Sequence, residues 1–204
     1  MKRLLIYGGT FDPVHKGHEN ALNAAKSLVR PDLTVIIPNK LPPHKDSPGL
    51  VSGEQRMDML RLAFGEGPGI EYSDYELTHE GKSYSLYTLQ HFKKEYKGYE
   101  LYFIVGSDSL CSFSKWYEYE KLLKLCTLVC VSRQIGDTAE LEAAKGFLEK
   151  KGGRVIIANA EPIEISSSNI REMIKNGDDP SCYLNENVVK YIYDNSLYRK
   201  EVLN

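Results

Sequence analysis

The sequence has no long apolar run and no excess of basic charge. Its 204 residues include 26 basic and 28 acidic side chains, so the formal net charge is −2. This balance lacks the electrostatic signature of proteins that bind nucleic acid or anionic membrane surfaces. The apolar stretch at residues 4–6 is too short for a secretory signal, and no run in the sequence approaches the length that crosses a bilayer. We therefore expect neither nucleic acid nor a membrane among its partners.

Cysteine is scarce as well, and its spacing lacks the paired pattern of a metal site. The four cysteines are Cys111, Cys126, Cys130 and Cys182. Cys126 and Cys130 lie within an apolar run that is typical of a strand. We interpret the four thiols as buried and free, consistent with a reducing cytoplasm, and predict no metal site built from protein ligands alone.

No repeat, low-complexity tract or linker interrupts the chain, and its length suits one α/β domain with a stable core. Short apolar runs alternate with segments of helical periodicity, which predicts a doubly wound parallel sheet. We expect a single domain over residues 1–198 and a C-terminal tail over 199–204. The expected strands are residues 4–6, 33–38, 70–77, 99–105, 127–132 and 154–158. The expected helices include residues 19–28, 86–96, 139–151 and 187–195, and others begin near Ser52 and Asn169.

The most informative stretch follows the first expected strand and has the sequence GGTFDPVHKGH over residues 8–18. Gly8 and Gly9 allow the backbone to approach a bulky anion and to take dihedral angles closed to other residues. Thr10 adds a hydroxyl donor at the turn. The helix that follows offers unpaired N–H groups and the positive end of its dipole, which together favour a phosphate.

Two histidines stand at the start of that helix. His15 and His18 are three residues apart, so we expect both on one face of the first turn, with Gly17 leaving space where a phosphate would approach. A strand, a glycine turn and a helix are common in α/β folds, and a single histidine at a helix start more often meets only solvent. The combination within one window favours the binding of a nucleotide phosphate.

This stretch resembles the (H/T)xGH signature of the nucleotidyltransferase superfamily, and most closely that of the bacterial nicotinate mononucleotide adenylyltransferases. The resemblance implies a Rossmann-like nucleotidyltransferase fold and transfer of the adenylyl group of ATP to nicotinate mononucleotide in NAD biosynthesis. It also implies Mg²⁺ carried largely by the oxygens of ATP. The attacking phosphate is already ionised at pH 7, so the chemistry needs positioning and charge neutralisation rather than a general base.

A second motif, ISSSNIR at residues 165–171, runs small hydroxyl residues into a helix start and closely matches the family's ISSxxIR motif. Asn169 with Glu172 is expected to cap that helix. In the family this motif binds the ATP phosphates from the side that faces the histidines. The catalytic residues implied are His15, His18 and Arg171, with His18 as the transition-state donor. The ATP-binding residues implied are Gly8, Gly9, Thr10, Phe11, His15, His18, Gly106, Asp108, Ser167 and Arg171.

Other loops follow the expected strands. Lys45, in the sequence PPHK, could meet a phosphate at a strand's carboxyl end, although a plain surface connection is the alternative. In the resembled family that loop faces the active site and an arginine matching Arg56 supports it; an exposed structural arginine is the alternative.

Asp108, in Gly-Ser-Asp where the family has Gly-Ala-Asp, could bind ribose hydroxyls or a metal-bound water, or only cap a helix. Arg133 could take a phosphate in bidentate fashion or be a simple surface residue.

The sequence SYSLYT at residues 83–88 stands where the family has SYT, a hydrophobic residue, and DT. Ser85 keeps a hydroxyl that could face a pyridine carboxylate, whereas Tyr87 replaces a carboxylate and its role is open. Trp116 and Tyr117 match residues that border the nicotinate pocket in the family, although a single tryptophan is usually a core residue. The mononucleotide-binding residues implied are Lys45, Tyr84, Ser85, Trp116, Tyr117 and Arg133.

Three other functions are compatible with parts of the sequence. Phosphopantetheine adenylyltransferases and cytidylyltransferases share the histidine motif but do not explain the PPHK loop together with Trp116 and Tyr117. A nucleotide-binding regulatory module would not need His15, His18 and Arg171 intact. An RNA-ligand-binding fragment related to synthetases is disfavoured by the neutral charge. We expect ATP and nicotinate mononucleotide as partners; a homo-oligomer is compatible with the sequence, which leaves open how strictly nicotinate is preferred over nicotinamide.

Overall fold

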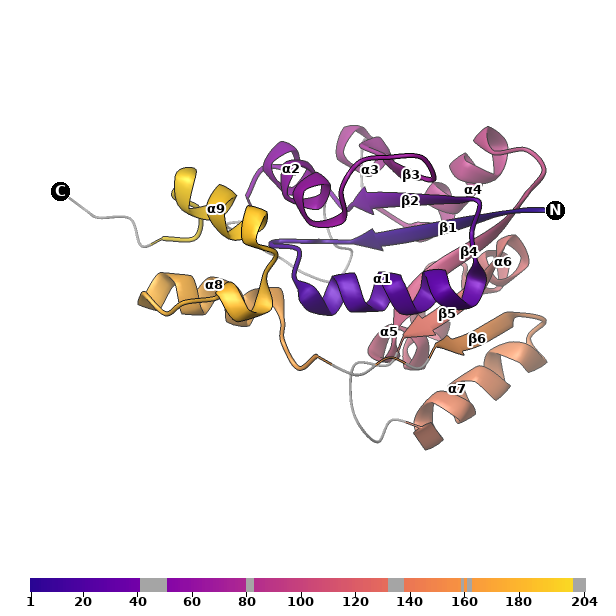
Figure 1. The fold of residues 1–204 in the computed structure, drawn as a ribbon. Coiled ribbons are helices and arrows are strands. Elements are labelled where there is room, and N and C mark those ends of the chain that lie inside the picture. Colours follow the sequence, from indigo (N-terminus) through magenta and orange to yellow (C-terminus); the bar gives the residue numbers. More distant parts are fainter. Residues whose placement is uncertain (41–50, 80–82, 132–137, 159, 161–162, 200–204) are drawn as a thin grey trace.

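A six-stranded parallel sheet organises the computed structural model, which describes residues 1–40, 51–79, 83–131, 138–158, 160 and 163–199 (Figure 1). The strand order is β3-β2-β1-β4-β5-β6, and every pair of neighbours runs parallel. This order confirms the predicted doubly wound, Rossmann-like fold. The strands are β1 (Lys2–Gly9), β2 (Leu33–Pro38), β3 (Ile70–Tyr72), β4 (Tyr99–Gly106), β5 (Cys126–Val131) and β6 (Arg154–Ala158).

Helices cover both faces of the sheet, as the crossovers between parallel strands require. Figure 1 shows α1 along the sheet, with α8 and α9 beyond the carboxyl end of β1. None of the helices in the described part of the chain is long and apolar enough to span a bilayer. The helices are α1 (Lys16–Val29), α2 (Gly53–Phe64), α3 (Tyr75–Thr78), α4 (Ser85–Glu95), α5 (Ser107–Cys111), α6 (Tyr119–Leu125), α7 (Thr138–Lys150), α8 (Ser167–Asn176) and α9 (Glu186–Asp194), with 3₁₀ turns η1 (Phe113–Lys115) and η2 (Ser181–Tyr183).

The core has two layers because side chains alternate along each buried strand. On β1, Leu5 and Tyr7 pack into the layer formed with α1, α2, α8 and α9. Leu4 and Ile6 point to the other face and pack with α4, α5, α6 and α7. Each fully buried aliphatic side chain contributes about 1.5–3 kcal/mol, so both faces hold the sheet in place.

The third expected strand is only partly confirmed. β3 ends at Tyr72, and the expected continuation over residues 73–77 is wrong because α3 forms there. The backbone carbonyl of Asp74 accepts hydrogen bonds from the amides of Leu77 and Thr78, at 2.9 and 3.0 Å, and so closes a helical turn. A loosely alternating apolar pattern did not distinguish this turn from a strand.

Two helix starts were predicted from their sequences. At α2, Ser52 Oγ accepts from the Gln55 amide (3.1 Å) and Gln55 Oε1 accepts from the Ser52 amide (3.0 Å), which confirms the capping box. At α8 the expected pair Asn169 and Glu172 is wrong: Ser166 is the N-cap and its hydroxyl accepts from the Asn169 amide at 3.1 Å. Ser166 has the extended backbone that the capping position requires.

Candidate active site

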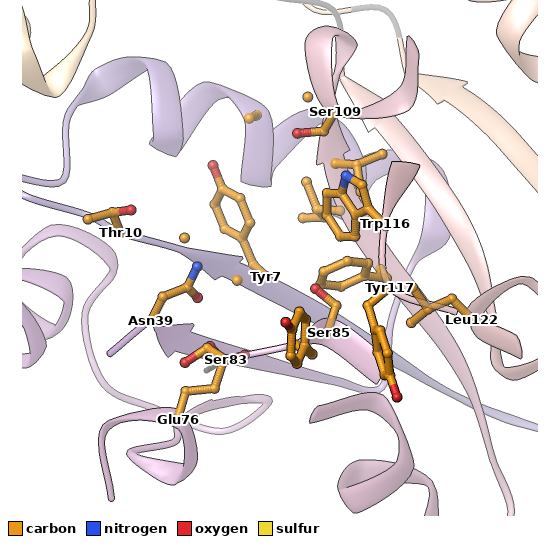
Figure 2. A pocket seen from close by; sticks show the side chains of 18 of the residues that line it. Tyr7, Thr10, Asn39, Glu76, Ser83, Ser85, Ser109, Trp116, Tyr117 and Leu122 are labelled. Carbon is orange, nitrogen blue, oxygen red and sulfur yellow. The ribbon is translucent and has the colours of Figure 1, made fainter. Parts of the chain in front are cut away.

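A cavity of about 530 Å³ opens at the carboxyl ends of β1 and β4 (Figure 2). These two strands are neighbours at the point where the strand order reverses, which is where open α/β sheets bind their ligands. The volume is in the range of small-molecule sites, about 300–1,000 Å³. The lining residues are Tyr7, Gly8, Gly9, Thr10, Ala21, Asn39, Glu76, Ser83, Tyr84, Ser85, Phe103, Ile104, Val105, Gly106, Ser109, Lys115, Trp116, Tyr117, Leu122 and Val131.

The cavity brings together residues from both predicted binding sets. Four of them come from the ATP set and four from the mononucleotide set. They are Gly8, Gly9, Thr10 and Gly106, and Tyr84, Ser85, Trp116 and Tyr117. Lys45 and Arg133 lie outside the described residues. The lining residues that sequence reasoning did not assign to a ligand include Asn39, Glu76, Ser109 and Lys115.

The turn after β1 needs glycine for a steric reason. A Cβ atom added to Gly9 would lie 2.8 Å from the Phe11 ring, and the Phe11 side chain is buried. Neither Gly8 nor Gly9 has a positive φ, so the expected need for unusual dihedral angles is wrong. Phe11 carries the left-handed conformation instead, with φ 50°. Its ring lies edge-on to His18 (centroids 5.0 Å apart) and so supports the turn. Phe11 does not line the cavity, and neither do His15, His18, Ser167 and Arg171, so their contacts with ATP stay predictions.

The two histidines lie against each other at the N-terminus of α1. Their ring centroids are 3.7 Å apart, and the side chains are only 4% and 8% exposed for His15 and His18. The backbone N–H of His15 donates to His18 Nδ1 at 3.2 Å. Since Nδ1 accepts this bond, a neutral His18 carries its proton on Nε2 and can donate from there.

Gly17 makes room for a side chain rather than for an anion. A Cβ atom added at this position would lie 3.0 Å from two atoms of the His15 ring. The expectation that Gly17 leaves open space for a phosphate is therefore wrong. Its smallness instead allows the His15 imidazole to fold back over the first turn of α1 and to meet His18.

The start of α8 is bonded to the loop that precedes α1. Ser167 Oγ donates to the Pro13 carbonyl at 2.9 Å, and Arg171 Nη1 donates to the Asp12 carbonyl at 2.6 Å across 159 residues of sequence. Arg171 Nη2 also donates to Ser168 Oγ (3.2 Å). The two sequence motifs are thus bonded to each other in the fold. The Arg171 side chain is 33% exposed, so its fork of N–H groups can still reach an anion.

Arg56 supports the loop that precedes α1. It is buried, and its Nη1 donates to the Thr10 carbonyl (2.8 Å) and to the Asn39 carbonyl (2.7 Å). The exposed alternative is therefore wrong. Support of the PPHK loop stays a prediction, because residues 41–50 lie outside the described part of the chain. Because Thr10 and Asn39 both line the cavity, one guanidinium fixes the ends of β1 and β2 together.

The other end of the cavity is aromatic (Figure 2). The Trp116 indole stacks on Phe113, with ring centroids 4.9 Å apart, and so presents a fixed flat surface. Tyr84 and Tyr117 approach to 4.7 Å at the edge of the cavity. Tyr87 lies 6.1 Å from Tyr84 and 6.0 Å from Tyr117, so the tyrosine that replaces the family's aspartate joins this cluster.

A buried carboxylate that the sequence did not reveal lines the cavity near Ser83. Glu76, on α3, accepts a hydrogen bond from the Thr88 hydroxyl of α4 at 2.6 Å. Burial raises the pKa of Glu76, and hydrogen bonds from Thr88 and Ser83 act in the opposite direction. This side chain connects α3 to the segment that carries Tyr84 and Ser85. Because residues 70–77 were expected to form a strand, the sequence did not indicate that Glu76 lines the cavity.

Asp108 is exposed in the first turn of α5 and does not line the cavity. The N-cap of α5 is Gly106, whose position has no side-chain bond, so the capping alternative for Asp108 is wrong. Its interaction with ribose or a metal-bound water stays a prediction.

Comparison with known proteins places the chain in a family. The cytidylyltransferase-like family model matches residues 6–173. A protein of Clostridium botulinum strain Alaska E43, named "Probable nicotinate-nucleotide adenylyltransferase", is 37% identical over 202 residues, covering 98% of this chain and 100% of the relative. A protein of the same name from Shewanella woodyi is 33% identical over 208 residues, covering 97% and 99%.

Solved structures show the same fold. The nicotinic acid mononucleotide adenylyltransferase of Plasmodium falciparum, complexed with APC, superposes with a TM-score of 0.77 at 23% identity, covering 97% of this chain and 98% of that one. The sequence identity of the curated relatives and the extent of the family match assign the chain to a family as well as to a fold. The chain belongs to the cytidylyltransferase-like family and groups there with the nicotinate-nucleotide adenylyltransferases.

Proposed function

We propose that this protein transfers the adenylyl group of ATP to nicotinate mononucleotide, giving nicotinate adenine dinucleotide and pyrophosphate in NAD biosynthesis. One observation carries the proposal: the histidine loop and the start of α8 are bonded to each other beside a cavity whose far end is aromatic. The names of the relatives support it, as do the titles of the Plasmodium structures, one with APC and one with NaAD.

The reaction is an in-line displacement at phosphorus. An oxygen of the mononucleotide's 5′-phosphate bonds to the α-phosphorus of ATP, and the bond from that phosphorus to the bridging oxygen breaks to release pyrophosphate. The attacking phosphate is already ionised at pH 7, so neither a general base nor a covalent enzyme intermediate is needed. The protein must hold two anions in line and neutralise the charge that develops between them.

His15 and His18 are the proposed donors to the α- and β/γ-phosphates, with His18 as the transition-state donor. The His18 Nδ1 atom accepts the His15 amide, which leaves Nε2–H as the group that can donate to a phosphate oxygen. The N-terminus of α1 adds unpaired amides and its positive dipole end. Arg171 supplies charge from the other side, and Ser167, whose hydroxyl donates to Pro13, contributes through the N-terminal amides of α8.

Mg²⁺ fits this site as an ion brought by the nucleotide. Among the described residues no three His, Cys, Asp or Glu side chains lie close enough to hold a metal. Mg²⁺ prefers oxygen ligands and is commonly bound by substrate phosphates and water. When bound, it would neutralise charge on the triphosphate, while His15, His18 and Arg171 orient the same groups.

The mononucleotide is proposed to lie at the aromatic end, with its pyridine ring on Trp116. Tyr84, Ser85 and Tyr117 border that end, and the amide at the start of α4 can face the pyridine carboxylate. Lys45 and Arg133 are proposed phosphate ligands from the sequence alone. A cytoplasmic location and assembly into homo-oligomers also stay predictions.

Pyrophosphate release tests the proposal directly. The purified protein is mixed with ATP, Mg²⁺ and one acceptor at a time: nicotinate mononucleotide, nicotinamide mononucleotide or phosphopantetheine. We expect pyrophosphate in equal amount to dinucleotide, fastest with nicotinate mononucleotide. Turnover with phosphopantetheine alone would overturn the proposal, and ATP binding without turnover on any acceptor would indicate a regulatory module.

A further inference from the structure

A tyrosine far along the chain is bonded to the loop between the two glycines and His15. The hydroxyl of Tyr198, which follows α9, donates to Asp12 Oδ1 at 2.7 Å across 186 residues of sequence. Leu197 beside it is buried in the core layer of α1. Ser196 and Tyr198 both have φ in the left-handed region, 53° and 62°, which is uncommon for side-chain-bearing residues. The chain therefore turns sharply to bring this ring to Asp12.

Asp12 lies where the histidine loop, Arg171 and Tyr198 meet. Its side chain is 1% exposed, and its carbonyl accepts from Arg171. Its Oδ2 atom lies 3.7 Å from Arg171 Nη1, and Arg56 contributes positive charge nearby. The Tyr198 hydroxyl is the side-chain donor to Oδ1, and the Val51 backbone amide also hydrogen-bonds to the Asp12 carboxylate. A buried carboxylate that loses its donor becomes costly to keep in place.

We propose that Tyr198 is a positioning residue for adenylyl transfer: its hydroxyl holds Asp12, and through Asp12 it holds both the loop that leads to His15 and the guanidinium of Arg171. The inference rests on the proposed function and deepens it. The ring of Tyr198 alone would anchor the chain against the core. The hydroxyl adds a bond to the carboxylate of Asp12, which belongs to the first motif and lies 3.7 Å from Arg171 of the second.

The ionisation of the pair agrees with this geometry. Burial raises the pKa of Asp12, while Tyr198, Arg171 and Arg56 oppose that rise. Burial and the neighbouring Asp12 raise the pKa of the Tyr198 phenol above its ordinary value, so it stays protonated and keeps donating at neutral pH.

The same fold region offers a matched control. Tyr191, on α9, donates from its hydroxyl to Asp58 Oδ2 of α2 at 2.9 Å. This bond also joins a tyrosine to a carboxylate and ties α9 to the body of the fold. Asp58, however, is 42% exposed and pairs with Arg61 on the same helix, away from either motif.

The experiment compares Tyr198→Phe with Tyr191→Phe in the full chain, with ATP, Mg²⁺ and nicotinate mononucleotide. We expect Tyr198→Phe to lower kcat at least tenfold and to leave KM for the mononucleotide within twofold, because Asp12 does not line the aromatic end. Tyr191→Phe should keep kcat within twofold. Equal kcat values for the two variants, or a loss in KM alone, would overturn the inference.

Two further measurements separate positioning from folding and from the function itself. Calorimetric binding of the α,β-methylene analogue of ATP should weaken at least fivefold in Tyr198→Phe and be unchanged in Tyr191→Phe; equal binding overturns the inference even if no acceptor is turned over. A wild-type protein that releases no pyrophosphate would instead defeat the proposed function. If Tyr198→Phe does not fold, Asp12→Ala replaces it, because it removes the acceptor of the Tyr198 hydroxyl together with the charge beside Arg171. Its kcat should also fall at least tenfold, and an unchanged kcat would overturn the inference.

Discussion

The two ends of the cavity are held in different ways. One end is formed by the histidine loop and the start of α8, and we call it the phosphate end. There His15, Asp12 and Arg56 are buried, and the loop carbonyls accept hydrogen bonds from arginine and serine side chains. At the aromatic end, Tyr87 and Tyr117 are 39% and 46% exposed and meet mainly through their rings.

The difference agrees with the ligand proposed for each end. Donors that stabilise developing charge must be fixed before the reaction, since reorganising them would cost part of the stabilisation they provide. A flat ring is recognised by area and stacking, which tolerate small shifts. Two departures from the family pattern, at Ser85 and Tyr87, fall at the aromatic end and a third is Ser107, whereas the histidine motif is intact. Four substitutions test this contrast.

His18→Ala should have the largest effect. Removing the proposed Nε2–H donor is expected to lower kcat about a hundredfold, a loss of about 2.7 kcal/mol in transition-state stabilisation. Steady-state release of pyrophosphate measures it. His91→Ala, at a half-exposed position on α4, is the control and should keep kcat. A decrease of less than tenfold in His18→Ala would show that the phosphate end does not depend on this imidazole.

Trp116→Ala should act on one substrate only. Loss of the stacking surface is expected to raise KM for nicotinate mononucleotide about tenfold, in line with about 1–3 kcal/mol for stacking of a base on an aromatic ring. KM for ATP should change less than twofold. Because Trp116 packs on Phe113, circular dichroism must first show a folded variant, with Phe147→Ala on α7 as an exposed control. Equal increases in both KM values would contradict the division into two ends.

Glu76→Gln should change how stability depends on pH. Burial raises the pKa of Glu76 in the folded state above the ordinary value of 4.5, so the folded protein binds this proton more tightly than the unfolded chain. The associated stability is present at pH below 4.5 and is lost as pH rises through the folded pKa. The free energy of unfolding, measured with urea across this pH range, should therefore decrease less steeply for Glu76→Gln than for the wild type. Glu142→Gln, exposed on α7, should follow the wild type; parallel curves for all three would refute this account.

Tyr87→Phe should have the smallest effect. The hydroxyl of Tyr87 interacts with Tyr117, whose pKa this neighbour raises, but both side chains are open to solvent. We expect KM for the mononucleotide to change less than threefold and kcat not at all. Tyr87→Asp, which restores the family residue, sharpens the comparison. A tenfold loss of kcat in Tyr87→Phe would mean that the aromatic end is as tightly constrained as the phosphate end.

The sheet, the cavity and the two motifs were predictable because each depends on a local pattern. Apolar runs at strand length gave five strands with small errors at their ends, and the histidine and triple-serine motifs are contiguous in sequence. Trp116 was predictable because its polar surroundings did not suit a core residue. These features need only neighbours within about ten positions to be recognised.

The supports of the site were not predictable, because their partners are distant. Nothing near Asp12 indicates that Tyr198 donates to it, and nothing near Glu76 indicates a bond from Thr88. The steric roles of Gly9 and Gly17 likewise depend on where the Phe11 and His15 rings fold back. A single sequence shows that a residue is present, whereas its long-range partner is defined only by the packed fold.

The bonds that fix the loop at residues 12 and 13 have a consequence for synthesis. All six strands are complete at Ala158, yet the groups that hold this loop come from Ser167, Arg171 and Tyr198. A polypeptide emerging from the ribosome therefore acquires its whole sheet before it can acquire a finished phosphate site.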